Sequence, residues 1–211
     1  MLMRPTTFVK HVIAMRCMMI PLVLISCVIP AAIHCDKPVS PPKAEGTLTI
    51  SYTINPSLSG EPESPHFSVV IWLEDKRGNY VRTLALGEWL SDNGYDYENF
   101  KDVCKTWGSK SNWATTTEPV DAITRASGKE GELGNLGQHT VEVELSELGI
   151  DQGTYVCNME VGVRSERNIL CTAEIAVASE EVEETPTPYY VPEPVEEIGM
   201  VLGNVSILYT P

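Results

Sequence analysis

The fold class of this 211-residue chain is decided by one short segment, Thr47-Leu48-Thr49-Ile50-Ser51-Tyr52-Thr53-Ile54. Apolar residues fall at every second position of the segment, and threonine or serine occupies the positions between them. A period of two places alternate side chains on opposite faces of an extended strand. The segment is therefore predicted to be a β-strand with one buried face and one polar face.

A hairpin is predicted downstream of this strand. Residues 67–74 form a more continuous apolar run, which is typical of a central strand covered on both faces. Residues 75–79 (Asp-Lys-Arg-Gly-Asn) have the chemistry of a turn, with Gly78 available for positive φ. Residues 80–86 then return as the partner strand.

Further alternating segments follow at 140–145, 154–163 and 169–177, and the apolar residues 198–211 predict a final strand that returns to the sheet. Together these strands predict an all-β fold. It is a single-domain, mainly antiparallel β-sandwich over residues 46–211.

Residues 88–113 interrupt the β pattern and form a tryptophan-rich insert. A short helix near 96–107 is predicted because apolar residues recur there at helical spacing. The insert is interpreted as a cap packed over one end of the sandwich. The alternative is an exposed platform on which a partner or a planar ligand stacks, formed by Trp89, Trp107 and Trp113.

The N-terminal residues 1–32 combine three basic residues, no acidic residue and an uncharged apolar run, which predicts a secretory signal peptide or lipoprotein leader. Leu24-Ile25-Ser26-Cys27 resembles a lipobox, with Cys27 as the lipidated residue, and cleavage near Ala31 or Ala32 is the alternative. The chain is thus expected in the periplasm or at the cell surface. Membrane contact is expected only through a lipid at Cys27 or an uncleaved leader.

The polar, proline-rich residues 33–45 are predicted to be a flexible spacer. Residues 179–197 hold seven glutamates, four prolines and no basic residue, which predicts a solvated acidic loop. The formal net charge is −14, and loss of the leader would make it more negative by three. Such a charge argues against binding to nucleic acid or to anionic lipid.

Four cysteines follow the leader: Cys35, Cys104, Cys157 and Cys171. An even number in an exported chain permits two disulfides, and the spacing matches no zinc motif. Cys157 and Cys171 fall on the apolar faces of adjacent strands. The spacing leaves open whether these two form a bridge or are small buried core residues.

No arrangement of residues predicts an enzyme active site or a metal site. The histidines have no serine or cysteine at a spacing that suggests a nucleophile and its base. Glu74 and Asp75 are adjacent in a strand end, so they point to opposite sides and do not form an acid–base pair. His139 is interpreted as a strand-edge residue.

Residues 121–127 (Asp-Ala-Ile-Thr-Arg-Ala-Ser) resemble the Asp-x-Thr/Ser-Gly-Ala-Thr/Ser segment on which flavin transferases attach FMN. The resemblance implies that Thr124 is the acceptor hydroxyl, with Asp121 and Ser127 as the other site residues and covalent FMN as the cofactor. Arg125 stands where that pattern has glycine. The alternative interpretation is a surface turn between a linker and a strand, without any cofactor.

A set of ordered landmarks resembles the predicted periplasmic proteins of domain-of-unknown-function family 2271. The landmarks are Val69–Asp75, Gly78–Leu84, the tryptophan-bearing insert, Asp121–Thr124, Gly153–Tyr155 and Val205–Pro211. The resemblance implies an exported immunoglobulin-like sandwich, similar to that of flagellar hook-capping proteins. It also implies relatives that occur alongside flavin-transferase and membrane redox proteins.

Three hypotheses for function follow. The first is a non-catalytic cell-envelope module that binds or positions a protein partner. The second is a periplasmic electron-transfer protein with FMN attached at Thr124. The third is a ligand-binding module that uses the tryptophans of the insert.

Overall fold

The computed structural model describes residues 40–56, 67–87, 90, 103–112, 124–125, 133–164, 167–191 and 201–211. For Thr124, Arg125 and Arg164 it describes the backbone alone. The predicted leader 1–32, including Cys27, lies outside these residues, as does Cys35. Ser40–Pro211 form one compact unit.

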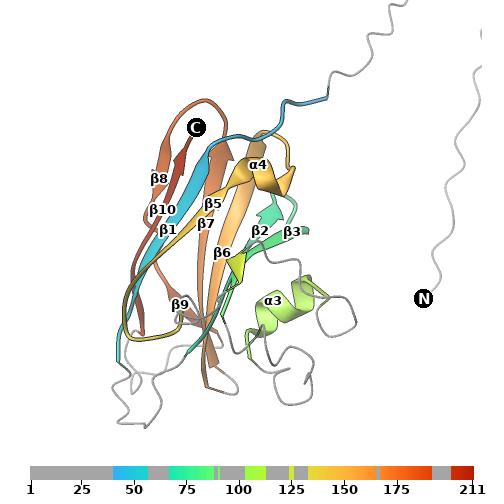
Figure 1. Cartoon of the computed structure of the whole chain (residues 1–211). Coiled ribbons are helices and arrows are strands. Elements are labelled where there is room, and N and C mark those ends of the chain that lie inside the picture. Colours follow the sequence, from blue (N-terminus) through green and yellow to red (C-terminus); the bar gives the residue numbers. More distant parts are fainter. Residues whose placement is uncertain are drawn as a thin grey trace, which may run out of the picture. The chain divides into compact units, whose positions relative to one another are not determined.

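Two β-sheets face each other and form a sandwich (Figure 1). One sheet has four strands in the order β5-β1-β10-β8, and the other has six in the order β4-β3-β2-β6-β7-β9. Neighbouring strands are antiparallel except for β3 and β4, which are parallel. The predicted all-β, mainly antiparallel sandwich is confirmed. The strands are β1 (Thr47–Ile54), β2 (Ser68–Asp75), β3 (Tyr80–Leu86), β4 (Thr124–Arg125), β5 (Gly137–Glu144), β6 (Gly153–Arg164), β7 (Arg167–Val177), β8 (Val182–Glu184), β9 (Tyr189–Val191) and β10 (Leu202–Thr210).

The main core lies between the two sheets and is built by the alternating positions of the strands. In β1, Leu48, Ile50, Tyr52 and Ile54 are buried, as the period of two predicts. The inward side chains of β6 and β7 meet them from the opposite sheet. Burial of each large apolar side chain contributes roughly 1.5–3 kcal/mol, so the core accounts for much of the stability of the fold.

Strand β2 is central and buried on both faces, as predicted. Its residues Val69, Ile71 and Leu73 face the main core, whereas Val70 and Trp72 belong to a second apolar cluster on the outer side of the sheet. The turn to β3 is closed by Asp75, whose Oδ1 accepts hydrogen bonds from the N–H groups of Arg77 (2.8 Å) and Asn79 (2.9 Å). Gly78 in this turn has a φ of 81°, which glycine adopts without steric cost.

The second cluster is covered by part of the insert. Helix α3 (Lys105–Lys110) lies on the outer side of the six-stranded sheet, away from the four-stranded sheet (Figure 1). The predicted helix near 96–107 is wrong at Val103 and Cys104, which form a turn. Cys104 has a φ of 50°, so the chain enters α3 from a left-handed conformation that a helix cannot continue. Residues 91–102 lie outside the described residues.

The predicted flexible spacer is wrong for residues 42–45, which dock on the sandwich. The N–H of Ala44 donates to the C=O of Ile150 (2.9 Å), and the N–H of Gln152 donates to the C=O of Pro42 (2.8 Å). Lys43 forms an ion pair with Asp151 (2.8 Å), beside the short helix α4 (Leu145–Leu148). The proline-rich composition of this segment predicts a flexible spacer and does not reveal that Ala44 is buried.

The segment 179–197 also differs from the predicted solvated loop, because it contains two edge strands. β8 pairs with β10 of one sheet, and β9 pairs with β7 of the other. Tyr190 of β9 packs on the main core. The two glutamates of β8 are exposed. Because this short strand carries mainly charged residues, its composition is the same as that of a solvated linker.

Candidate functional site

The acceptor-like segment contributes a strand to the edge of the six-stranded sheet. Thr124 and Arg125 form β4, which pairs with Ala85 and Leu86 of β3. The alternative prediction of a surface turn is therefore wrong at these two residues, because their backbone is extended and pairs with the end of β3. Asp121 and Ser127 lie outside the described residues, so the geometry of the three predicted site residues stays a prediction.

Trp107 does not form an exposed platform. Its side chain is fully buried against the outer side of the six-stranded sheet, and its Nε1–H donates to Thr83 Oγ1 (3.0 Å). The insert thus covers the sheet with this residue, and the stacking role predicted for it is wrong. Trp89 and Trp113 lie outside the described residues.

A buried carboxylate that was not predicted from the sequence holds the start of α3. Glu160 on β6 has no exposed surface. Its Oε1 accepts from the N–H of Thr106 (3.1 Å), and its Oε2 accepts from the N–H of Trp107 (2.8 Å). These two N–H groups belong to the first helical turn, where backbone N–H groups have no partner within the helix. Since Cys104 provides no side-chain cap, Glu160 caps the helix from the sheet.

Asn168 of β7 completes this contact, because its Nδ2 donates to Glu160 Oε1 (2.7 Å). Its Oδ1 is buried and has no hydrogen-bond partner among the described residues. Burial raises the pKa of Glu160, and the hydrogen bonds from Trp107 and Thr106 oppose that shift. Both oxygens of the Glu160 carboxylate therefore accept hydrogen bonds that hold the insert and β7 in place.

The end of α3 is fastened by a second carboxylate. Lys110 Nζ donates to Glu74 Oε2 (3.1 Å) and to the C=O of Gly78 (2.8 Å). Glu74 Oε1 accepts from Trp72 Nε1–H (2.9 Å). Glu74 and Asp75 thus have separate structural partners, as expected for residues on opposite sides of a strand end.

Three cysteines among the described residues are free and buried. Cys157 lies opposite Ala173, and Cys171 lies opposite Met159, so the two thiols are diagonal neighbours on the core face. The interpretation as buried core residues is confirmed, and the bridge between them is not formed. Burial raises the pKa of Cys157 and of Cys171 to about 12.

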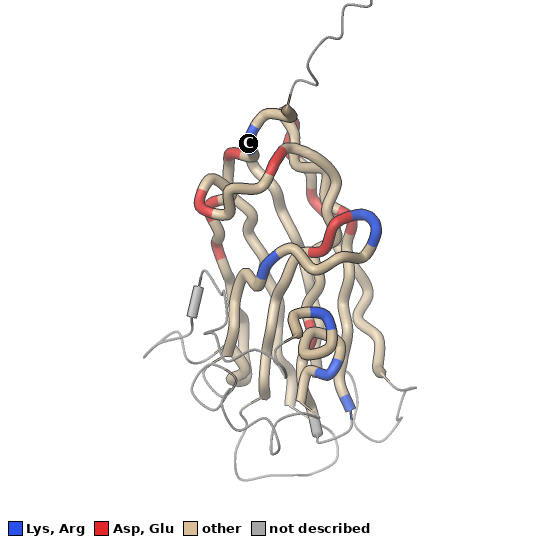
Figure 2. Tube along the Cα trace, turned by 90° about the vertical axis from the view of Figure 1, so that its right-hand side faces the viewer, with Lys and Arg blue, Asp and Glu red and all other residues tan. Residues whose placement is uncertain are grey.

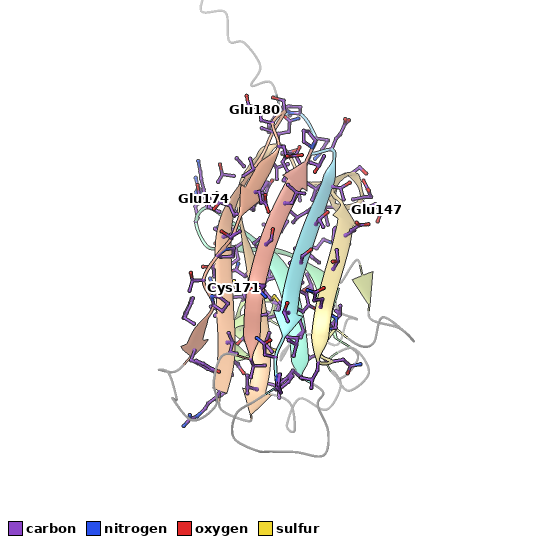
Figure 3. The ribbon with its side chains drawn as sticks, turned by 90° about the vertical axis from the view of Figure 1, so that its left-hand side faces the viewer. Glu147, Cys171, Glu174 and Glu180 are labelled. Carbon is purple, nitrogen blue, oxygen red and sulfur yellow. The ribbon has the colours of Figure 1, made fainter. Side chains whose placement is uncertain are left out.

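The outer face of the four-stranded sheet is polar, in contrast to the outer face that α3 covers. It presents the second set of alternating residues of β1 together with the exposed residues of β5. Cross-strand contacts include Thr47 Oγ1 with Glu144 Oε1 (2.9 Å) and Ser51 Oγ with Thr140 Oγ1 (3.3 Å). Figure 3 views this face, with β5 at one margin of the sheet and Glu147 beside its end.

His139 of β5 is held by its neighbours, in agreement with its interpretation as a strand-edge residue. Its ring stacks on Tyr52 with a centroid distance of 5.1 Å, and its Nε2 lies 2.8 Å from the C=O of Asn135. No group of three or more His, Cys, Asp or Glu able to hold a metal ion occurs among the described residues.

Charge is unevenly distributed over the sandwich. Asp and Glu gather toward the end where the C-terminus lies, whereas α3 carries lysines (Figure 2). In the part of the chain that the structure describes, no helix is long and apolar enough to span a membrane.

The family model described as "Predicted periplasmic protein (DUF2271)" matches residues 47–190, which is more than half of the chain. No curated protein and no solved structure matches the chain significantly. The match begins at β1 and ends at Tyr190 of β9, so it covers strands of both sheets, the insert and the acceptor-like segment, while β10 lies beyond it. The chain therefore belongs to the DUF2271 family of predicted periplasmic proteins.

Proposed function

We propose that the protein is exported and acts as a non-catalytic module of the cell envelope that binds or positions a partner protein. The observation that carries the proposal is the asymmetry of the sandwich. The outer face of the six-stranded sheet is used to dock α3, while the outer face of the four-stranded sheet presents exposed polar side chains up to the margin formed by β5. The family description as predicted periplasmic proteins supports the location.

The roles of the buried polar groups support a non-catalytic function. Glu160 accepts three hydrogen bonds that hold the insert, and Glu74 holds Trp72 and Lys110. The ring of His139 is fixed between Tyr52 and Asn135. General acid or base catalysis requires a group that faces the substrate, and these groups face the fold.

The test is the native size and location of an epitope-tagged chain in its own cells. We expect it in the periplasmic or envelope fraction, in a complex larger than the chain alone, with one protein recovered by cross-linking in stoichiometric amount. A chain that stays in the cytosol, or that runs as an isolated monomer under mild extraction, would contradict the proposal.

A second candidate is electron transfer by FMN esterified to Thr124. The observation in its favour is that β4 stands last in the strand order of its sheet within the described residues, rather than between two other strands. The threonine oxygen would bond to the FMN phosphorus of FAD as the bond from that phosphorus to the bridging pyrophosphate oxygen breaks. AMP would leave with that oxygen, and the hydroxyl proton of the threonine would pass to solvent. FMN would then supply the redox chemistry.

Intact mass after co-expression with a flavin transferase tests this candidate. An added FMN mass that disappears in Thr124→Ala, and persists in Thr140→Ala, would establish it. An unmodified wild-type chain under conditions in which a known acceptor is modified would remove it.

A further inference from the structure

We infer that the free edge of β5 is the docking element for the partner, which adds an extended segment carrying lysine or arginine at alternate positions. This inference rests on the proposed function and names the chemistry of the partner. Main-chain hydrogen bonds would supply the attachment, and the glutamates of β5 would select the sequence.

Half of the backbone groups of β5 point away from its sheet. The N–H of Leu145 donates to the C=O of Gly46 (2.9 Å), which places a bonded pair at the end of the ladder with β1. Bonded and non-bonded pairs alternate in an antiparallel ladder. Residues 143, 141, 139 and 137 therefore bond to β1, and the outward N–H and C=O groups belong to Gln138, Thr140, Glu142 and Glu144.

The length of β5 distinguishes it from the other margins of the two sheets. β5 has eight residues, whereas β4 has two and β8 and β9 have three each. In the described ranges, no strand pairs with the outward side of β5. Short edge strands are a common protection against pairing with other chains, and β5 alone among these four margins has the length for a stable added strand.

The side chains that accompany the outward backbone groups define the partner. Glu142 and Glu144 are exposed on one face, two residues apart, and Glu147 is exposed beside the end of the strand (Figure 3). Opposite charges on directly paired residues stabilise a strand pair, and like charges destabilise it. A second copy of the chain would bring the same glutamates and a net charge of −14, so a basic partner is favoured.

The test uses the purified protein and a ten-residue peptide of alternating lysine and valine, with binding measured by calorimetry at constant salt. Thr140→Pro removes an outward N–H that pairs with no strand of the described residues, and Glu142→Lys/Glu144→Lys reverses the charge of the edge. We expect each change to weaken binding at least about tenfold. Glu174→Lys/Glu180→Lys, two exposed residues away from β5 (Figure 3), makes the same change of net charge and should alter the affinity less than about twofold.

Several results would overturn the inference. They are failure of the wild-type protein to bind the peptide, tight binding by a folded Thr140→Pro variant, or an equal loss in the Glu174→Lys/Glu180→Lys control. If Thr140→Pro does not fold, the comparison of the two charge-reversed variants decides. A native complex that persists in cells carrying Glu142→Lys/Glu144→Lys contradicts the docking site and leaves the proposed function standing, whereas absence of any wild-type complex contradicts the function itself.

Discussion

Glu160 performs the task that a helix usually assigns to its own capping residue. An unsatisfied buried N–H costs about 1–3 kcal/mol, and α3 begins with two such groups against the sheet. A carboxylate on β6 accepts from both N–H groups, and it accepts a third hydrogen bond from the side chain of Asn168. The three partners of Glu160 are all donors, and the two oxygens of one carboxyl group accept from all of them.

The pKa of Glu160 leads to a prediction for stability. Burial raises this pKa above the ordinary value of 4.5. Such a group contributes stability that is fully present below its unfolded pKa and is lost as the pH rises through its folded pKa. Between about pH 4 and pH 8, we therefore expect the free energy of unfolding of wild type to fall relative to that of Glu160→Gln as the pH rises.

Denaturant titration at each pH measures this difference, and Glu174→Gln on the exposed face of β7 is the control for the loss of one carboxylate. The raised pKa would be contradicted if the free energy of unfolding of wild type, relative to that of Glu160→Gln, stayed constant or increased as the pH rises.

The buried cysteines give a second prediction at this scale. Because burial raises the pKa values of Cys157 and Cys171 to about 12 and that of Cys104 well above its ordinary range, their thiolates are scarce near neutral pH. We expect no alkylation of these three residues in the native protein and full alkylation in guanidinium without reductant, by peptide mapping. Protection of Cys157 and Cys171 that persists in denaturant would mean that they are bridged.

At the scale of elements, α3 is short and depends on the sheet for its stability. Helices of this length are not stable alone, so packing and capping by β6 and β2 must hold it. Trp107 provides the apolar contact, and Glu160 and Lys110 fasten the two ends. The outer cluster therefore forms only when the insert and the sheet meet.

Truncation of Trp107 tests this dependence. Trp107→Ala should lower the free energy of unfolding by roughly 3–5 kcal/mol, because it empties a fully buried site. Trp107→Phe retains much of the packing and loses the hydrogen bond to Thr83, so its loss should be nearer 1 kcal/mol. A loss below about 1 kcal/mol for Trp107→Ala would indicate that α3 does not depend on this contact.

The elements that could be predicted from sequence are those whose apolar residues have a clear period. β1, β6 and β7 bury their predicted faces in the core, and β2 is covered on both faces as predicted. β8 and β9 could not be predicted, since three residues are too few for a period and glutamate and proline dominate around them. Glu160 occupies the polar face of β6, and its burial depends on an insert far away in sequence.

At the scale of the whole molecule, the compact unit begins before β1. Pro42 and Ala44 bond to the segment after α4. The hydroxyl of Tyr209, near the C-terminus, donates to the C=O of Ala178 (2.6 Å) and lies 3.2 Å from the C=O of Glu45. The start of the unit, β10 and the end of β7 are thus tied together at one end of the sandwich. The composition of residues 42–45 indicates a linker, because the hydrogen bonds that dock Pro42 and Ala44 are made by backbone groups, which composition does not reveal.

A pair of truncations tests this boundary. A chain that begins at Gly46 should have a free energy of unfolding about 1–3 kcal/mol below that of a chain that begins at Ser40, since two backbone hydrogen bonds and the burial of Ala44 are lost. Lys43→Ala in the longer chain is the control. Its exposed ion pair should contribute less than about 1 kcal/mol. Equal stability of the two truncated chains would place the boundary at residue 46.

The candidate site was less predictable than the fold, because an open edge is a property of how strands are ordered. The alternation of residues 140–145 predicted a strand and its buried face, but not that β5 lies at the margin of its sheet. Amide-resolved hydrogen exchange of the purified protein tests this feature most directly. We expect fast exchange at Gln138, Thr140 and Glu142 and slow exchange at His139, Val141 and Val143. Slow exchange at all six amides would show that the edge is already covered and would contradict its role in docking.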